Sequence, residues 1–295
     1  MSSDGKTLFG RSYNIVVAPT GSPFGLDVSE LRCEFKVKKS LKPEPNVAEI
    51  KIYNLSEASR KVLENSEKLV VRLEAGYVDT GTSQLFLGEV RSAFTAAEGA
   101  DVITTITTGD SEKEMQEAKL NMTVAAGMPA DVVLAAIAAS LKVGPGNLAQ
   151  AAALLKLKGA TTMFGVTGSA VSGNAARMLT DLCRSAGLEW SIQDGNLQIL
   201  DKNKPAIAKA VLLSSSTGLI GSPSVDFSAS SKTKKGGVAV KAKCFIIPEL
   251  SCGRLVVLKS RFVTGGFRIE EIEYEGDTAG GDSSPWYANL VLRAL

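Results

Sequence analysis

Six acidic residues near the end of the chain are the group best suited to chemistry, and they are Glu270, Glu271, Glu273, Glu275, Asp277 and Asp282. Carboxylates at this density could bind a hard cation or supply the paired acids of glycoside hydrolysis. Their spacing lacks the order of an EF-hand loop, and Glu271, Glu273 and Glu275 take every second position of a predicted strand. Such alternation is typical of a solvated strand face, so we interpret the group as structural.

The sequence contains no histidine, which removes the side chain most often used as a general base or zinc ligand and excludes a Ser-His-Asp set. Gly165, Gly168 and Gly173 are followed by no Gly-Lys-Ser/Thr run, so no phosphate-binding loop is expected. The cysteines lack metal-ligand spacing and lie in apolar segments, which predicts buried free thiols at Cys33, Cys183, Cys244 and Cys252. The sequence therefore predicts no catalytic residue, no metal and no cofactor.

The charges of the chain are nearly balanced, with 33 basic and 31 acidic residues in 295 and a formal net charge of +2. The net charge therefore gives no reason to expect binding to nucleic acid, to a membrane surface or to an acidic substrate. The first ten residues are polar and no run of about 18 apolar residues occurs, so we expect neither a signal peptide nor a membrane span. We expect a protein that folds in the cytoplasm and makes no membrane contact.

The first segment of the chain, residues 1–110, is rich in β-strand patterns. Apolar positions alternate with charged ones at Leu31, Cys33, Phe35 and Val37. This period indicates a strand with one buried and one wetted face. Ser56 is placed to cap a helix over residues 57–65, and further strands rich in Val, Thr, Phe and Leu follow. The segment predicts an antiparallel barrel or sandwich of about six strands.

The composition becomes rich in alanine after residue 110. Two amphipathic helices are predicted there, over residues 128–141 and 174–186. Asn147 is placed to cap another helix, and Asp194-Gly195 between two apolar runs is a strong hairpin signal. Residues 111–205 are therefore predicted to form a small α+β domain between two β domains.

Turn-forming residues punctuate a second β-rich segment, residues 206–295. Glycines and a proline lead into its first strands, and a second proline, which cannot donate to a ladder, precedes a glycine at a predicted sharp corner. These turn formers are Gly218, Gly221, Pro223, Pro248 and Gly253.

Further turn signals surround the strand that carries the acidic group. Gly265-Gly266 predicts a hairpin turn, and strict alternation over residues 267–274 places Ile269 and Ile272 on opposite faces. The chain then turns at Gly276-Asp277-Thr278 before an apolar segment that begins at Trp286.

Taken in this order, the turns and strands resemble the C-terminal barrel of phage baseplate hub proteins, a family that includes the hub part of type VI secretion spikes. The residues that carry the resemblance are Gly218, Gly221, Pro223, Pro248, Gly253, Gly266, Gly276, Asp277, Thr278 and Trp286. The short helix after Asn54-Leu55-Ser56 is similar to one in the N-terminal barrel of that family. An insertion at residues 280–285 departs from the family pattern.

The resemblance implies a mainly β fold with an α+β insertion. Two tail-tube-like antiparallel β-barrels, residues 1–110 and 206–295, would be joined by the small α+β domain of residues 111–205. It implies a structural, non-enzymatic hub of a phage tail or related contractile injection machine, a homotrimer that joins a six-fold tail tube to a three-fold spike.

The partners implied by the resemblance are the tail tube protein, the tail spike protein and other baseplate proteins. DNA would meet the protein only in transit through the channel. The implied location is the tail baseplate of the virion, after assembly in the host cytoplasm.

Two alternatives stay open. The acidic group would be the cleft of a tail-associated cell-wall hydrolase, which a zymogram on peptidoglycan would reveal. A chain with only one complete barrel would instead be a tail tube or tail completion protein.

Overall fold

The computed structural model describes residues 8–22, 25–65, 68–109, 111–125, 127–158, 169–228, 237–281 and 284–295. These residues divide into two compact units, which are considered separately. The first unit contains residues 1–39, 46–109 and 207–295, and the second contains residues 40–45 and 110–206. Strands from both ends of the chain therefore belong to one unit.

The first unit is built on one large sheet that is antiparallel except for one pair of strands. In the described residues its strands are β1 (Arg11–Pro19), β2 (Leu26–Asp27), β3 (Cys33–Ser40), β4 (Val47–Tyr53), β5 (Leu69–Tyr77), β6 (Gly81–Glu98), β7 (Asp101–Gly109), β12 (Ile207–Ser214), β13 (Leu219–Ser228), β14 (Gly237–Phe245), β15 (Arg254–Lys259), β16 (Thr264–Asp277) and β17 (Trp286–Ala294). Their order is β13-β14-β17-β16-β3-β4-β7-β6-β5-β1-β2, with β15 beside β16 and β12 parallel to β15. The predicted mainly β fold is confirmed.

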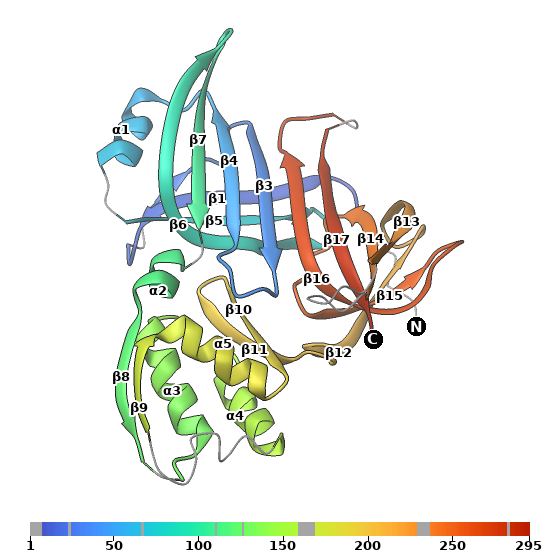
Figure 1. The fold of residues 1–295 in the computed structure, drawn as a ribbon. Coiled ribbons are helices and arrows are strands. Elements are labelled where there is room, and N and C mark those ends of the chain that lie inside the picture. Colours follow the sequence, from blue (N-terminus) through green and yellow to red (C-terminus); the bar gives the residue numbers. More distant parts are fainter. Residues whose placement is uncertain are drawn as a thin grey trace. The chain divides into compact units, whose positions relative to one another are not determined.

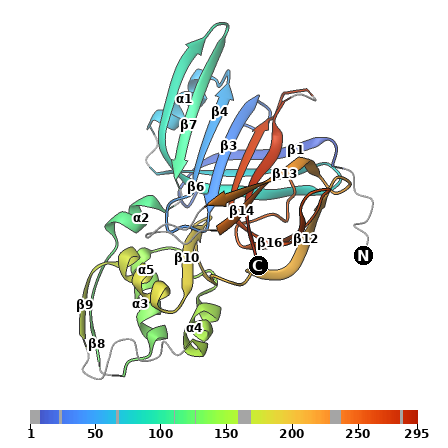
Figure 2. The same cartoon turned by 45° about the vertical axis from the view of Figure 1, so that its right-hand side comes forward.

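The two ends of the chain meet where β16 lies beside β3 (Figures 1 and 2). Strands from residues 1–110 and strands from residues 206–295 thus form one continuous sheet. In the described residues the strand order is an open path, and the closure of two separate barrels stays a prediction.

Apolar side chains at every second strand position fill the core of the first unit. In β3, Cys33, Phe35 and Val37 are buried and Phe35 faces Ile50 of β4, as the sequence predicts. Helix α1 (Glu57–Asn65) begins after Ser56, whose Oγ accepts the Ser59 N–H at 3.1 Å. The predicted cap is confirmed.

The second unit packs helices against short two-stranded sheets. Its elements are α2 (Glu112–Glu117), β8 (Lys119–Val124), α3 (Ala130–Leu141), α4 (Leu148–Leu157), β9 (Ser169–Asn174), α5 (Ala175–Ser185), β10 (Leu188–Gln193) and β11 (Asn196–Asp201). Strand β8 pairs with β9 and β10 pairs with β11, while α3 packs against both α4 and α5. The β10–β11 hairpin turns at Asp194 and Gly195, both at positive φ (52° and 76°), as Asp-Gly predicts.

Asn147 precedes α4 as predicted, but its side chain does not cap the helix. The Asn147 amide nitrogen donates to the carbonyl of Ile199 at 2.7 Å, and its oxygen accepts the Ile199 N–H at 2.8 Å. The side chain thus satisfies both polar groups of one β11 residue. The predicted cap is wrong because a tertiary partner uses both ends of the amide.

Candidate functional site

Charged residues from opposite ends of the chain meet in the first unit at the strand junction, which we define as Arg11, Arg32, Cys33, Asp277 and Thr278. The Arg32 guanidinium donates to both carboxylate oxygens of Asp277, from Nε at 3.3 Å and from Nη2 at 3.0 Å. This contact raises the pKa of Arg32. Asp277 is buried, so the pair fixes a carboxylate that water barely reaches.

Thr278 continues the junction beyond the end of β16. Its N–H donates to the Cys33 carbonyl at 2.9 Å, and its Oγ1 accepts the Cys33 N–H at 2.8 Å. One threonine therefore satisfies both backbone groups of the first β3 residue. Burial raises the pKa of the Cys33 thiol to about 12, so this cysteine stays protonated and inert.

Arg11 of β1 contacts the end of β16 and described residues of the segment that follows it. Its guanidinium donates to four carbonyl oxygens, those of Asp277 (2.7 Å), Gly280 (3.2 Å), Gly281 (3.1 Å) and Ser284 (3.1 Å). The guanidinium carbon of Arg11 lies 5.4 Å from the centre of the Trp286 ring. Sequence reasoning missed Arg11 and Arg32, because no local pattern links them to partners more than 240 residues away.

Gly276 and Trp286 pack against aromatic residues of the first segment. A Cβ on Gly276 would lie 2.2 Å from the Phe35 ring, so only glycine fits there. Phe35 and Tyr13 meet the Trp286 ring edge-on, with centroids 5.5 Å and 6.2 Å away. Four of the residues that carry the family resemblance therefore lie in or beside the junction: Gly276, Asp277, Thr278 and Trp286.

The other residues that carry the family resemblance lie between the start of β13 and β16. The Gly218 carbonyl accepts the Phe245 N–H at 2.9 Å, and Gly221 and Pro223 lie where the β13–β14 register shifts between Ile220 and Ser224. Pro248 lies in a turn closed by the Leu250 N–H on the Ile247 carbonyl at 3.1 Å. Gly253 has φ of 85° and donates its N–H to Ile269 at 2.8 Å. The predicted corner is confirmed.

Gly265-Gly266 was predicted to turn the β15–β16 hairpin, and this is wrong. Both glycines lie within β16, opposite Leu258 and Val257. The turn precedes them: the Ser260 N–H donates to the Val263 carbonyl at 3.1 Å, and Ser260 Oγ accepts the Val263 N–H at 3.0 Å. A serine turn replaces the glycine turn because its side chain supplies the missing hydrogen bonds.

The predicted strict alternation along β16 is also wrong. Ile269 and Ile272 are both buried, because the register with β17 shifts between Ile269 and Glu271. A bulge adds one residue to one strand, so the side-chain pattern changes face there. Beyond it, Glu271, Glu273 and Glu275 do share one face.

The acidic group does not converge on one point. Glu270 accepts from Arg268 Nε at 2.8 Å and lies 3.1 Å from Arg293 Nε. Lys36 Nζ lies 3.3 Å from Glu273 and 3.8 Å from Glu275. In the described residues no group of three or more Cys, Asp or Glu could hold a metal ion, and Asp282, Gly165 and Gly168 lie outside those residues.

The solvent-facing side of β3, β14 and β16 carries both signs of charge, and we call it the charged face: Lys36, Lys38, Lys241, Lys243, Glu271, Glu273 and Glu275. Lys36 lies between Glu49, its partner on β4, and Glu273 on β16. Lys243 Nζ lies 3.4 Å from the centre of the Tyr287 ring, whose hydroxyl donates to Glu275 at 2.9 Å. A groove of about 420 Å³ crosses this face between β13 and β16.

The sheet has an unpaired edge at two distant strands. Strand β13 pairs only with β14, and residues 92–98 of β6 pair only with β7 in the described part of the chain. This outer half of β6 projects, together with β7, beyond β4 (Figures 1 and 2). It presents Phe94, which is 68% exposed. Unpaired edges are templates for strands of other chains.

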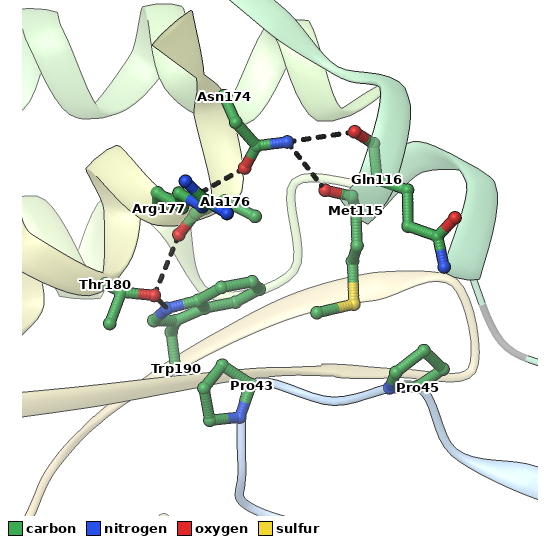
Figure 3. Close-up of a pocket in the computed structure, with 9 residues that line it drawn as sticks. All are labelled: Pro43, Pro45, Met115, Gln116, Asn174, Ala176, Arg177, Thr180 and Trp190. Atoms are coloured by element: carbon green, nitrogen blue, oxygen red, sulfur yellow. Dashed lines mark hydrogen bonds between the residues drawn. The ribbon is translucent and has the colours of Figure 1, made fainter.

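A pocket of about 520 Å³ lies in the second unit (Figure 3), and we call it the Pro-Trp pocket. It is lined by Pro43, Pro45, Met115, Gln116, Asn174, Ala176, Arg177, Thr180 and Trp190. Trp190 Nε1 donates to Thr180 Oγ1 at 3.0 Å, and that hydroxyl donates to the Ala176 carbonyl at 2.8 Å. Asn174 caps α5, since its side-chain oxygen accepts the Arg177 N–H at 3.0 Å.

Known structures share this fold. The 43 kDa tail protein of prophage MuSo2 from Shewanella oneidensis matches with a TM-score of 0.61 at 9% identity, over 96% of this chain and 97% of that one. A tail protein from Neisseria meningitidis MC58 gives 0.60 at 10% identity, over 97% of both chains. The Escherichia coli c3393 protein, described as a type VI secretion component with structural similarity to T4 tail proteins gp27 and gp5, gives 0.57 at 9% identity, over 95% and 76%.

At this identity the structures show that the chain shares the fold of these tail proteins, and no more. The family model described as Baseplate hub gp41 matches residues 16–280, and the chain belongs to that family. The predicted family is thus confirmed, and membership implies a structural role in the virion tail. No curated protein sequence matches the chain. Among the described helices, none has the length and apolar character needed to cross a bilayer.

Proposed function

We propose that the chain is the trimeric adaptor of the baseplate, joining the six-fold tail tube to the three-fold spike. The observation that carries this proposal is a pair of free edges in one sheet: in the described residues, β13 has a neighbour on one side only, and so has the outer half of β6. The edges are different, so contact between copies is heterologous and must close into a ring or grow into a filament. Edge-to-edge pairing of β13 with the outer half of β6 would give a continuous ring of strands.

Three copies would reconcile the two symmetries. Each chain contributes two β-rich segments, residues 1–110 and 206–295, which we propose act as two tube-like domains, with residues 111–205 as an α+β domain between them. Three chains then place six such domains around one axis. This arrangement would meet a six-fold tube with similar contacts and keep three-fold symmetry for a spike, and other baseplate proteins would bind its periphery.

The charged face is the surface we assign to the channel. Interfaces between proteins concentrate apolar side chains at their core, whereas this face interleaves lysine and glutamate. Mixed charge would let DNA pass without holding it, because the described residues of this face form no extended basic stripe that could bind phosphates. The adaptor would have no enzymatic role, make no membrane contact and assemble in the host cytoplasm.

The outer half of β6 offers a direct test. The β6–β7 hairpin turns over Gly99-Ala100, so Glu98 and Asp101 form a hydrogen-bonded pair. Hydrogen-bonded pairs alternate with non-hydrogen-bonded ones along an antiparallel ladder. The backbone N–H and C=O groups of Ala93, Thr95 and Ala97 therefore point away from β7. Val102 of β7, which lies opposite Ala97, fits this pattern. Its carbonyl points away from β6 and accepts the Asn54 N–H at 2.7 Å.

Ala93→Pro should therefore remove an outward N–H while leaving the β6–β7 ladder intact, because proline is tolerated at strand edges. We expect it to prevent ring formation in native mass spectrometry, on the purified chain mixed with its tail tube protein. Ala93→Val, which keeps the N–H, is the matched control. Rings of three formed equally by both variants would contradict the proposed edge contact.

A further inference from the structure

We propose that the Pro-Trp pocket of the second unit binds a short peptide segment of a partner in which an apolar side chain adjoins a carboxylate. The pocket volume of about 520 Å³ is within the range of roughly 300–1,000 Å³ typical of ligand sites. All its lining residues belong to one compact unit. The inference goes beyond the trimeric adaptor and does not depend on how the sheet assembles.

The walls of the pocket suit an apolar side chain. Pro43 and Pro45 have rigid rings and no N–H, and Met115 adds an adaptable thioether (Figure 3). Trp190 is nearly fully buried, and its indole N–H, the one polar group of the side chain, donates a hydrogen bond to Thr180. The Thr180 hydroxyl donates to Ala176 and accepts from Trp190, so these walls offer packing rather than hydrogen bonds.

The charge at the pocket is a single cation. Arg177 is exposed in the first turn of α5 and is the only charged residue among those that line the pocket. The nearby acids have other partners: Glu44 accepts from the Ser40 hydroxyl at 3.2 Å, and Asp181 lies 3.6 Å from Arg184. In the described residues no acid forms an ion pair with Arg177.

A carboxylate is the complement of this cation. A guanidinium binds it through two parallel hydrogen bonds, and the positive end of the α5 dipole adds to the attraction. A free inorganic anion is a poorer ligand, because it would bind Arg177 but leave the apolar walls of the pocket without an apolar group packed against them. An Asp or Glu next to a Leu, Met or Phe satisfies both parts of the pocket at once.

A random hexapeptide library selected against the purified full chain tests this proposal. We expect enriched peptides to carry Asp or Glu within two positions of a large apolar residue. Synthetic peptides from the selection should bind in fluorescence anisotropy, and replacing their Asp or Glu by the amide should weaken binding about tenfold, the ratio that corresponds to about 1.4 kcal/mol.

Substitutions at an exposed position avoid the risk of unfolding. Arg177→Glu should abolish binding of the acidic peptides and favour variants in which Lys replaces the acid. Arg184→Glu changes the charge of the same helix equally but lies outside the pocket, and it should bind like the unaltered chain. The proposal is overturned if no peptide is enriched, if enriched peptides lack the carboxylate, or if Arg177→Glu and Arg184→Glu behave alike. A ring that fails to form would leave this result unaffected.

Discussion

Arg32 and Asp277, which are 245 residues apart in the chain, form a two-point contact of 3.3 and 3.0 Å that joins β3 to the end of β16. Arg32→Met leaves a carboxylate that is only 8% exposed with the Ala279 N–H as its remaining partner. Because the arginine itself is 42% exposed, we expect a loss of about 1–2 kcal/mol in the free energy of unfolding.

Chemical denaturation of Arg32→Met, Asp277→Asn and the double variant measures this coupling. Lys61→Met removes an exposed ion pair with Glu57 in α1 and should change stability by less than about 0.5 kcal/mol. If Arg32→Met cost no more than this control, the junction would not stabilise the unit.

Gly276→Ala should destabilise the first unit by about 1–3 kcal/mol, because its Cβ would overlap the Phe35 ring. Gly281→Ala in the same hairpin meets no atom within 4 Å and is the matched control. Phe35→Leu makes room at the contact, so the double variant should lose less than the sum of the two single losses. Thermal melts that show equal stability for Gly276→Ala and Gly281→Ala would refute the close approach.

Asp201 should make the second unit sensitive to acid. Its carboxylate accepts from Lys158 at 2.8 Å, and this bond, aided by the Asn203 N–H, lowers the pKa of Asp201. The stabilisation is therefore complete above the ordinary pKa of about 4 and is lost as the pH falls through the lower folded value. Asp201→Asn should cost stability at pH 7 and much less at pH 2, measured by urea denaturation.

Asp181→Asn provides the background for this comparison, because Asp181 is 75% exposed in the same unit. If Asp201→Asn lowered the free energy of unfolding as much at pH 2 as at pH 7, the charge of this carboxylate would not be what stabilises the native state.

The chain should not cleave peptidoglycan. The carboxylates of the acidic group that contact cations lie along one strand, where Lys36, Arg32 and Arg293 engage them separately. We expect no clearing in a zymogram that contains a lysozyme lane as positive control. Clearing that disappeared in Glu273→Ala or Asp277→Ala would instead favour the tail-associated hydrolase.

The sequence was sufficient where a pattern is local. Alternation in β3 predicted which residues are buried, and Asp194-Gly195 predicted the β10–β11 hairpin, because both depend on backbone geometry within a few residues. The cap at Ser56 is equally local. These elements required no knowledge of the rest of the fold.

Other features depend on partners distant in the chain. The bulge before Glu271 reverses the alternation that the sequence suggests, and the insertion of one residue leaves no compositional mark. Arg11 and Arg32 are ordinary surface arginines in sequence, and only the fold brings them to residues 277–284. The pairing of β16 beside β3 could not be predicted for the same reason.

The most direct test of the adaptor is an electron-microscopy reconstruction of the assembled tail tip. We expect three copies of this chain in one closed ring, with β13 of each copy beside the outer half of β6 of the next and the charged face toward the channel. A ring of six copies, or a single copy on the axis, would contradict it, because neither count matches two β-rich segments per chain to a six-fold tube.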